Sequence, residues 1–80
     1  MVAAVKLAGQ MRQNPRDWRI EDVETVAAHF GFRTRRPGGR HVTFSHPQLR
    51  HILTVPANRP VKPVYIRKLL ALIEQLEEWR

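Results

Sequence analysis

The chain has 80 residues, of which 42% are hydrophobic, and it carries a formal charge of +7 and no cysteine. This composition predicts one folded domain and excludes both a disulfide-stapled secreted module and a zinc site built from thiolates. No apolar run is long enough to cross a bilayer, and residues 1–13 lack the apolar core of a signal peptide, so we expect a soluble, cytoplasmic protein.

Two helices are predicted in the first part of the chain. Residues 2–12 carry a weak apolar stripe, and Asn14-Pro15 stops it. Residues 20–30 carry a stronger stripe, with acidic residues near the start, where the helix dipole favours negative charge. Gly31 follows as the expected C-terminal cap.

Three strands and a final helix are predicted for the rest of the chain. Residues 32–36 and 40–45 alternate in polarity around a Pro-Gly-Gly turn, and residues 50–55 form a third strand. Residues 63–78 carry the strongest helical stripe, and their leading proline fits a first helical turn. The order predicts an α+β domain with its helices on one face of a three-stranded antiparallel sheet.

The register of the predicted hairpin places arginines beside a histidine. If Arg36 lies opposite Arg40 across a three-residue loop, then Arg35 lies opposite His41, and apolar and basic residues separate onto different faces. A slip by one residue would mix the two sets, which supports this register. The other expected pairs are Phe32 with Phe44, Thr34 with Val42 and Arg33 with Thr43, and Gly38 and Gly39 are the expected turn residues.

The positive charge lies mainly in the middle of the chain. Six arginines and no acidic residue lie between Arg33 and Arg59, whereas the acidic residues lie in residues 17–24 and 74–78. Such a distribution is typical of a protein that binds a polyanion, either a nucleic acid or an acidic protein surface. The alternative is a solvated basic face that keeps a small protein in solution.

His41 is the candidate catalytic residue, and its alternative is an ordinary strand histidine on a solvated face. An imidazole transfers protons near neutral pH, and RNA carries its own nucleophile, the 2′-hydroxyl, beside each phosphate. Because Arg35 and Arg40 favour the neutral imidazole by like-charge repulsion, we expect His41 to act as a general base. The expected phosphate-binding residues are Arg33, Arg35, Arg36 and Arg40, with Lys62, Arg67 and Lys68 near the start of the last helix.

Other histidines and aromatic residues have structural interpretations that weigh more. His46 precedes a proline and is expected to be a turn residue. His41, His46 and His51 do not converge on alternating strands and have no carboxylate nearby, so we expect neither a metal site nor a cofactor. Three aromatic side chains can stack on bases, although such residues more often pack in small cores; they are Trp18, Tyr65 and Trp79.

Several short motifs follow one another at a specific spacing. They are Gly39-x-His41 at the start of a strand, His46-Pro47 five residues on, Thr54-Val55-Pro56 at the end of a strand, and Lys62-Pro63-x-x-Ile66-Arg67 leading into the final helix. Over about residues 20–76 this pattern resembles the HicA family of toxins from toxin–antitoxin systems. The resemblance implies a fold similar to a double-stranded RNA-binding domain, metal-independent cleavage of messenger RNA, and silencing by a HicB-like antitoxin.

The resemblance also assigns a role to one residue, because the family's essential histidine falls on His41. The family commonly reads Gly-Ser-His, often with a second histidine, whereas this chain has Arg40 and Val42 at those positions. Residues 1–19 are expected to form an N-terminal extension, and residues 20–80 a HicA-like domain. The prediction is thus an RNA-cleaving toxin of a type II system. The alternatives are an RNA-binding module of the same fold that does not cleave, and a basic protein-interaction domain.

Overall fold

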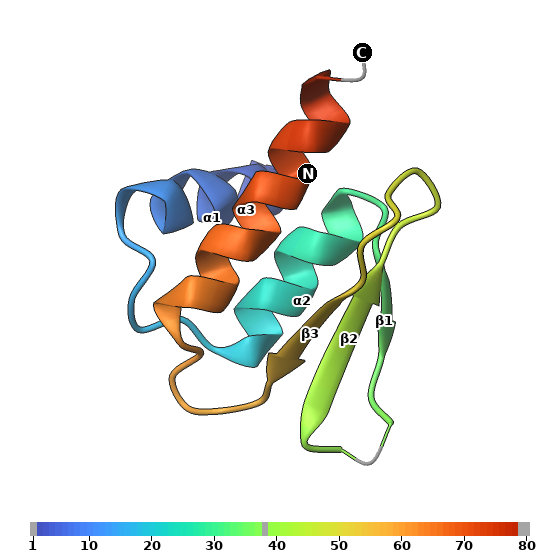
Figure 1. Ribbon diagram of the computed structural model, residues 1–80. Coiled ribbons are helices and arrows are strands. Elements are labelled where there is room, and N and C mark those ends of the chain that lie inside the picture. The colour runs from blue at the N-terminus through green and yellow to red at the C-terminus, as the bar shows by residue number, and fades with distance from the viewer. Residues whose placement is uncertain (1, 38, 79–80) are drawn as a thin grey trace.

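The computed structural model describes residues 2–37 and 39–78 (Figure 1). The order α-α-β-β-β-α confirms the predicted α+β fold, which is like that of a double-stranded RNA-binding domain. The sheet is antiparallel, with strand order β1-β2-β3, so β1 and β3 are its edges. The elements are α1 (Val2–Gln13), α2 (Ile20–His29), β1 (Arg33–Arg35), β2 (His41–Ser45), β3 (Leu53–Pro56) and α3 (Pro63–Glu78).

The turn that joins α2 to β1 is built around Gly31. This residue has a φ of +89°, in the left-handed region that glycine adopts without penalty. Its N–H donates to the carbonyl of Ala28 at 3.1 Å, and the N–H of Phe32 donates to that of Ala27 at 3.0 Å. These two bonds form a Schellman motif, which confirms the predicted cap and turns the chain into the sheet.

One hydrophobic core lies between the helices and the inner face of the sheet. In β2, Val42 and Phe44 are fully buried, whereas His41 is exposed and Thr43 is half-buried. The alternation directs every second side chain of the strand toward the helices. Burial of a side chain such as Phe44 stabilises the fold by about 1.5–3 kcal/mol, so the helix-covered face is fixed and the other face of the sheet is left open.

Helix α1 contributes to this same core. Ala8 and Met11 are buried in one cluster with Ile66 and Leu69 of α3. No helix in the described part of the chain is long and apolar enough to cross a membrane.

The register of the β1–β2 hairpin differs from the predicted one by two residues. Strand β1 ends at Arg35 and β2 begins at His41, so the connection is longer than the predicted three residues. A shift by two keeps each side chain on its predicted face, because side chains alternate with a period of two. The observed pairs are Arg33–Ser45, Thr34–Phe44 and Arg35–Thr43, so the predicted pairs Arg33–Thr43, Thr34–Val42, Arg35–His41, Phe32–Phe44 and Arg36–Arg40 are wrong.

The third strand begins later than predicted. A turn after β2 is closed by a hydrogen bond from the N–H of Leu49 to the carbonyl of His46, at 3.0 Å. Pairing with β2 starts only at Leu53, opposite Phe44, and extends to Pro56, opposite His41. Strand β3 therefore brings the start of the following loop beside His41.

Candidate functional site

The open side of the sheet carries the candidate residues of strands β1 and β2. We call this the outer face and define it by the exposed Arg33, Arg35, His41 and Thr54 together with the half-buried Thr43. Cross-strand pairing aligns Arg35, Thr43 and Thr54 in one row across the three strands. Arg35 is thus a diagonal neighbour of His41 on the same face.

His41 combines a fixed backbone with a free side chain. It pairs with Pro56 across the sheet, and the carbonyl of the preceding residue, Arg40, accepts a hydrogen bond from Ala57 at 2.9 Å. Its exposed ring forms no hydrogen bond with any residue that the structure describes. Both ring nitrogens are therefore open to a ligand, which is what a proton-transferring group requires.

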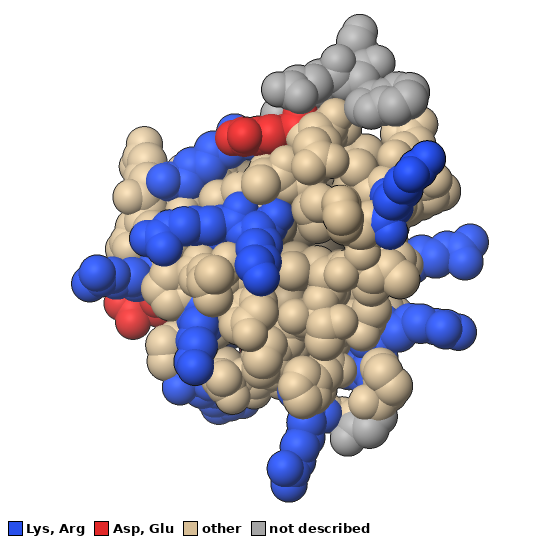
Figure 2. Space-filling view, viewed as in Figure 1, with Lys and Arg blue, Asp and Glu red and all other residues tan. Residues whose placement is uncertain are grey.

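The exposed arginines around His41 have no acidic partner among residues 2–37 and 39–78. Arg33, Arg35 and Arg40 are all exposed, and none forms an ion pair there. Figure 2 shows Lys and Arg side chains projecting from many parts of the face in view, with few acidic side chains among them. The three arginines keep their donors free for phosphate oxygens.

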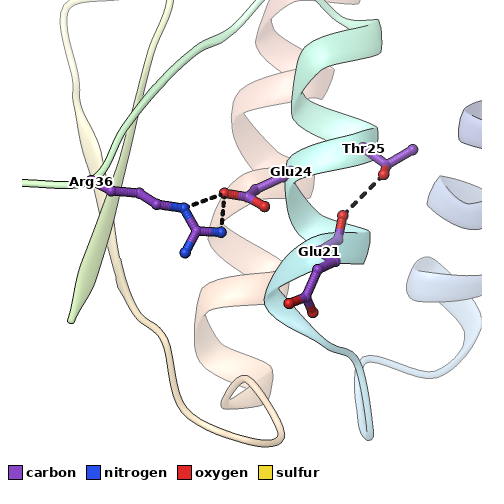
Figure 3. A network of polar contacts seen from close by, with 4 residues as sticks. All are labelled: Glu21, Glu24, Thr25 and Arg36. Atoms are coloured by element: carbon purple, nitrogen blue, oxygen red, sulfur yellow. Dashed lines mark hydrogen bonds and ion pairs between the residues drawn. The ribbon is translucent and has the colours of Figure 1, made fainter. Parts of the chain in front are cut away.

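Arg36 lies apart from the other arginines of the hairpin. Its Nε and Nη2 atoms contact Glu24 Oε2 of α2 at 3.0 and 2.6 Å (Figure 3). The pair lies on the helix side of the sheet and is partly exposed, so it contributes about 0.2–1 kcal/mol to stability. The alternation of side chains in residues 32–36 is the signal that separates Arg36 from Arg35.

Two of the three predicted cations near the start of α3 line hollows, and the third does not. Lys68 lines a hollow of about 370 Å³ beside β3, and its Nζ lies 5.7 Å from the ring centroid of Tyr65, within cation–π range. Lys62 lines a different hollow of about 460 Å³, together with Arg59. Arg67 is exposed between them in sequence and lines neither.

The predicted turn glycines are described only in part. Gly39 has a φ of +82°, and its N–H donates to the carbonyl of Arg36 at 3.3 Å. A positive φ explains why glycine stands at this position. Gly38 lies outside the described residues, as does Trp79, one of the three predicted stacking aromatics. The other two predicted stacking aromatics, Trp18 and Tyr65, pack against the core.

His46 is held on both sides of its ring. Nε2 lies 3.1 Å from the carbonyl oxygen of Phe30, and the N–H of Gln48 donates to Nδ1 at 3.1 Å. The neutral tautomer with its proton on Nε2 satisfies both contacts. The ring also packs edge-on against Phe32, with centroids 5.1 Å apart. His46 thus ties the turn after β2 to the end of α2, a contact that the sequence did not predict.

Arg16 and Arg59 were not predicted as site residues. Both are exposed, and both line the hollow that also contains Lys62. Arg16 precedes α2 and Arg59 follows β3, so no periodicity in the sequence connects them. Only the folding of residues 14–19 against the loop before α3 brings them together.

Comparison with protein families identifies a family that this chain resembles over most of its length. A family model described as the HicA toxin of bacterial toxin–antitoxin systems matches residues 20–77. The matched region runs from the start of α2 into α3, so it includes the whole sheet and excludes α1. Comparisons with curated proteins and with solved structures gave no significant match.

Proposed function

Because the chain belongs to the HicA toxin family of bacterial toxin–antitoxin systems, we propose that it is a toxin that cleaves messenger RNA with His41 as its proton-transferring group. Membership confirms the resemblance seen in the sequence and implies a HicB-like antitoxin as partner. The observation that carries the catalytic proposal is the exposed His41 ring, which has no hydrogen-bond partner in the described chain and stands on a backbone fixed by β3.

In the proposed reaction His41 takes the proton of an RNA 2′-hydroxyl. The 2′-oxygen then attacks the adjacent phosphorus, the bond from phosphorus to the 5′-oxygen breaks, and the leaving oxygen takes a proton from water. The products are a 2′,3′-cyclic phosphate and a 5′-hydroxyl. Arg35 and Arg40 would stabilise the negative charge that develops on the phosphate oxygens. Positioned proton transfer accelerates such a step by about 10²–10⁴-fold.

The two departures from the family pattern, at Arg40 and Val42, have little effect on the side chains that the outer face presents to RNA. Val42 stands where the family often has a second histidine, and it is fully buried in the core. A side chain at position 42 therefore faces the helices and does not contact an RNA strand on the outer face. Arg40, in place of the family's serine, is exposed and adds a cation at the position that precedes His41 in the chain.

We assign RNA binding to the exposed cations of the β1–β2 hairpin and of the start of α3. They are Arg33, Arg35, Arg40, Lys62, Arg67 and Lys68. Arg36 has a different role in this proposal, because Glu24 occupies its guanidinium. Residues 20–80 would form the HicA-like domain and residues 1–19 its N-terminal extension. An mRNA substrate would place the action of the toxin in the cytoplasm.

The proposal is tested by the chemistry of the RNA ends. Purified protein is incubated with an end-labelled RNA and, separately, with a 2′-deoxy strand of the same sequence. The proposal predicts cleavage of the RNA alone, giving a 2′,3′-cyclic phosphate and a 5′-hydroxyl. A 5′-phosphate product, or equal cleavage of the deoxy strand, would contradict attack by the 2′-hydroxyl. Binding without any cleavage would favour the RNA-binding module.

A further inference from the structure

A hollow with basic walls lies where the chain before α2 meets the loop before α3. It has a volume of about 460 Å³ and is lined by Arg16 and Asp17 on one side and by residues 58–63 on the other. The N–H of Val61 donates to the carbonyl of Trp18 at 2.8 Å and joins the two walls. Because Val61 is fully buried, the floor of the hollow is anchored in the core.

The first wall is also held in place. The indole Nε1 of Trp18 donates to the carbonyl of Asn14 at 2.6 Å, and the N–H of Arg16 donates to the side-chain oxygen of Asn14 at 3.1 Å. Trp18 packs against the hydrophobic core. The backbone that carries Arg16 is therefore fixed by bonds on both sides, so the hollow exists before a ligand arrives.

The charges around the hollow do not cancel. Arg16, Arg59 and Lys62 bring three positive charges, against one negative charge from Asp17. None of these four side chains forms an ion pair within residues 2–37 and 39–78. This excess of positive over negative charge raises the positive potential of the hollow and attracts an anion.

The hollow lies at the same end of the molecule as His41. Pro56 pairs with His41 at the end of β3, and the loop that follows leads directly to Arg59. Two residues lie between Pro56 and Arg59, so the Cα atoms of these two residues are within about 11 Å of each other. Figure 1 shows this loop and the start of β2 at one end of the fold.

We propose that this hollow is a second phosphate-binding site for RNA, which holds the backbone beyond the phosphate that is cleaved. The inference rests on the proposed function, since it extends the path of the same RNA strand. Guanidinium groups bind phosphate oxygens through paired hydrogen bonds, and Arg16 and Arg59 offer two of them from opposite walls. Arg16 lies outside residues 20–77, so this chain would use its N-terminal extension to bind the substrate.

The first test measures binding without cleavage, so that it does not depend on catalysis. All variants carry His41→Ala, and the ligands are a labelled RNA of twelve nucleotides and a dinucleotide. The double variant that carries both Arg16→Gln and Arg59→Gln is compared with the variant Arg50→Gln. Arg50 is an exposed arginine that does not line the hollow.

The double variant should weaken binding of the long RNA by about tenfold or more, the scale of one lost charge-assisted hydrogen bond. It should also lower the slope of log affinity against log salt by about 2. The affinity of the double variant for the dinucleotide should be unchanged, because a dinucleotide cannot span both sites. The Arg50→Gln variant should bind both RNAs with unchanged affinity. Equal losses for both RNAs, or an unchanged salt slope, would overturn the proposal.

A second test uses the chain with His41 in place. The double variant should raise KM for long RNA and leave kcat unchanged, because it removes binding remote from the reacting atoms. A lower kcat at unchanged KM would contradict the assignment. If the parent chain cuts no RNA, the proposed function fails, while the binding test still decides the hollow. If the double variant lost antitoxin binding and kept RNA binding, the hollow would be assigned to a protein partner and the proposal of an RNA site would be overturned.

Discussion

Two histidines at opposite ends of β2 have opposite surroundings. His41 opens the strand with an exposed ring that no described residue contacts by a hydrogen bond. His46 follows the last residue of the strand with both ring nitrogens engaged and its ring packed on Phe32. The same side chain thus has one environment suited to proton transfer and another suited to holding a turn. Partners decide which role a histidine has, and residue type alone does not.

The largest expected effect comes from removing the free ring. His41→Ala should lower the rate of RNA cleavage by about 10²–10⁴-fold and change the unfolding free energy by less than about 0.5 kcal/mol, because the side chain is exposed. In cells, growth arrest on expression should be relieved, with protein levels compared by immunoblot. The matched control is His51→Ala, another exposed histidine. Equal loss of activity in both variants would show that His41 is no more important for cleavage than another exposed histidine.

Removing the held ring should affect stability and leave catalysis intact. His46→Ala deletes the contacts to Phe30 and Gln48 and exposes part of Phe32. The free energy of unfolding should fall by about 1–3 kcal/mol, measured by urea denaturation. Cleavage per folded molecule should stay close to that of the parent chain. A variant as stable as the parent chain that has lost activity would contradict the structural role given to His46.

Gly31 sharpens the comparison, since its lack of a side chain leaves room for the held ring of His46. A Cβ at this position would lie 3.1 Å from His46 Nε2, and its φ of +89° is strained for alanine. Gly31→Ala should lower the unfolding free energy by about 1–2 kcal/mol from the backbone conformation alone. In the background of His46→Ala the clash disappears, so the two losses should be less than additive. Full additivity would contradict a contact between the added Cβ and the ring of His46.

Two neighbouring arginines give the smallest and most closely matched pair of effects. Arg35 is exposed on the outer face, whereas Arg36 is bound to Glu24. Arg35→Gln should lower the salt slope of RNA binding by about 1 without affecting stability. Arg36→Gln should lower the unfolding free energy by about 0.2–1 kcal/mol and leave the salt slope unchanged. Identical salt slopes in the two variants would show that they do not differ in RNA binding.

Periodicity predicted the helices and the two faces of the sheet. Alternating or three- and four-residue spacing reflects which side chains face the core, and this is set by local geometry. The exact register of the hairpin was wrong by two residues, because a shift of two leaves the faces unchanged and the pattern cannot detect it. The ion pair of Arg36 was not predicted for a related reason, since its partner Glu24 lies on a different element.

The hollow shows the limit of prediction from sequence in another way. Arg16 and Arg59 lie on segments that no shared pattern links, and only the bridge between Trp18 and Val61 brings them together. Contacts of this kind depend on tertiary packing and have no signature in spacing or composition. The match to residues 20–77 does not reach Arg16 either.

The most direct measurement is RNA binding and RNA cleavage by the His41→Ala protein, made on the same substrate and in the same buffer. The ring is exposed and has no partner in the described chain, so its removal should leave the fold and the arginines in place. The expected result is an unchanged Kd for RNA together with loss of cleavage. Cleavage at the parent rate by this variant would contradict the role given to His41.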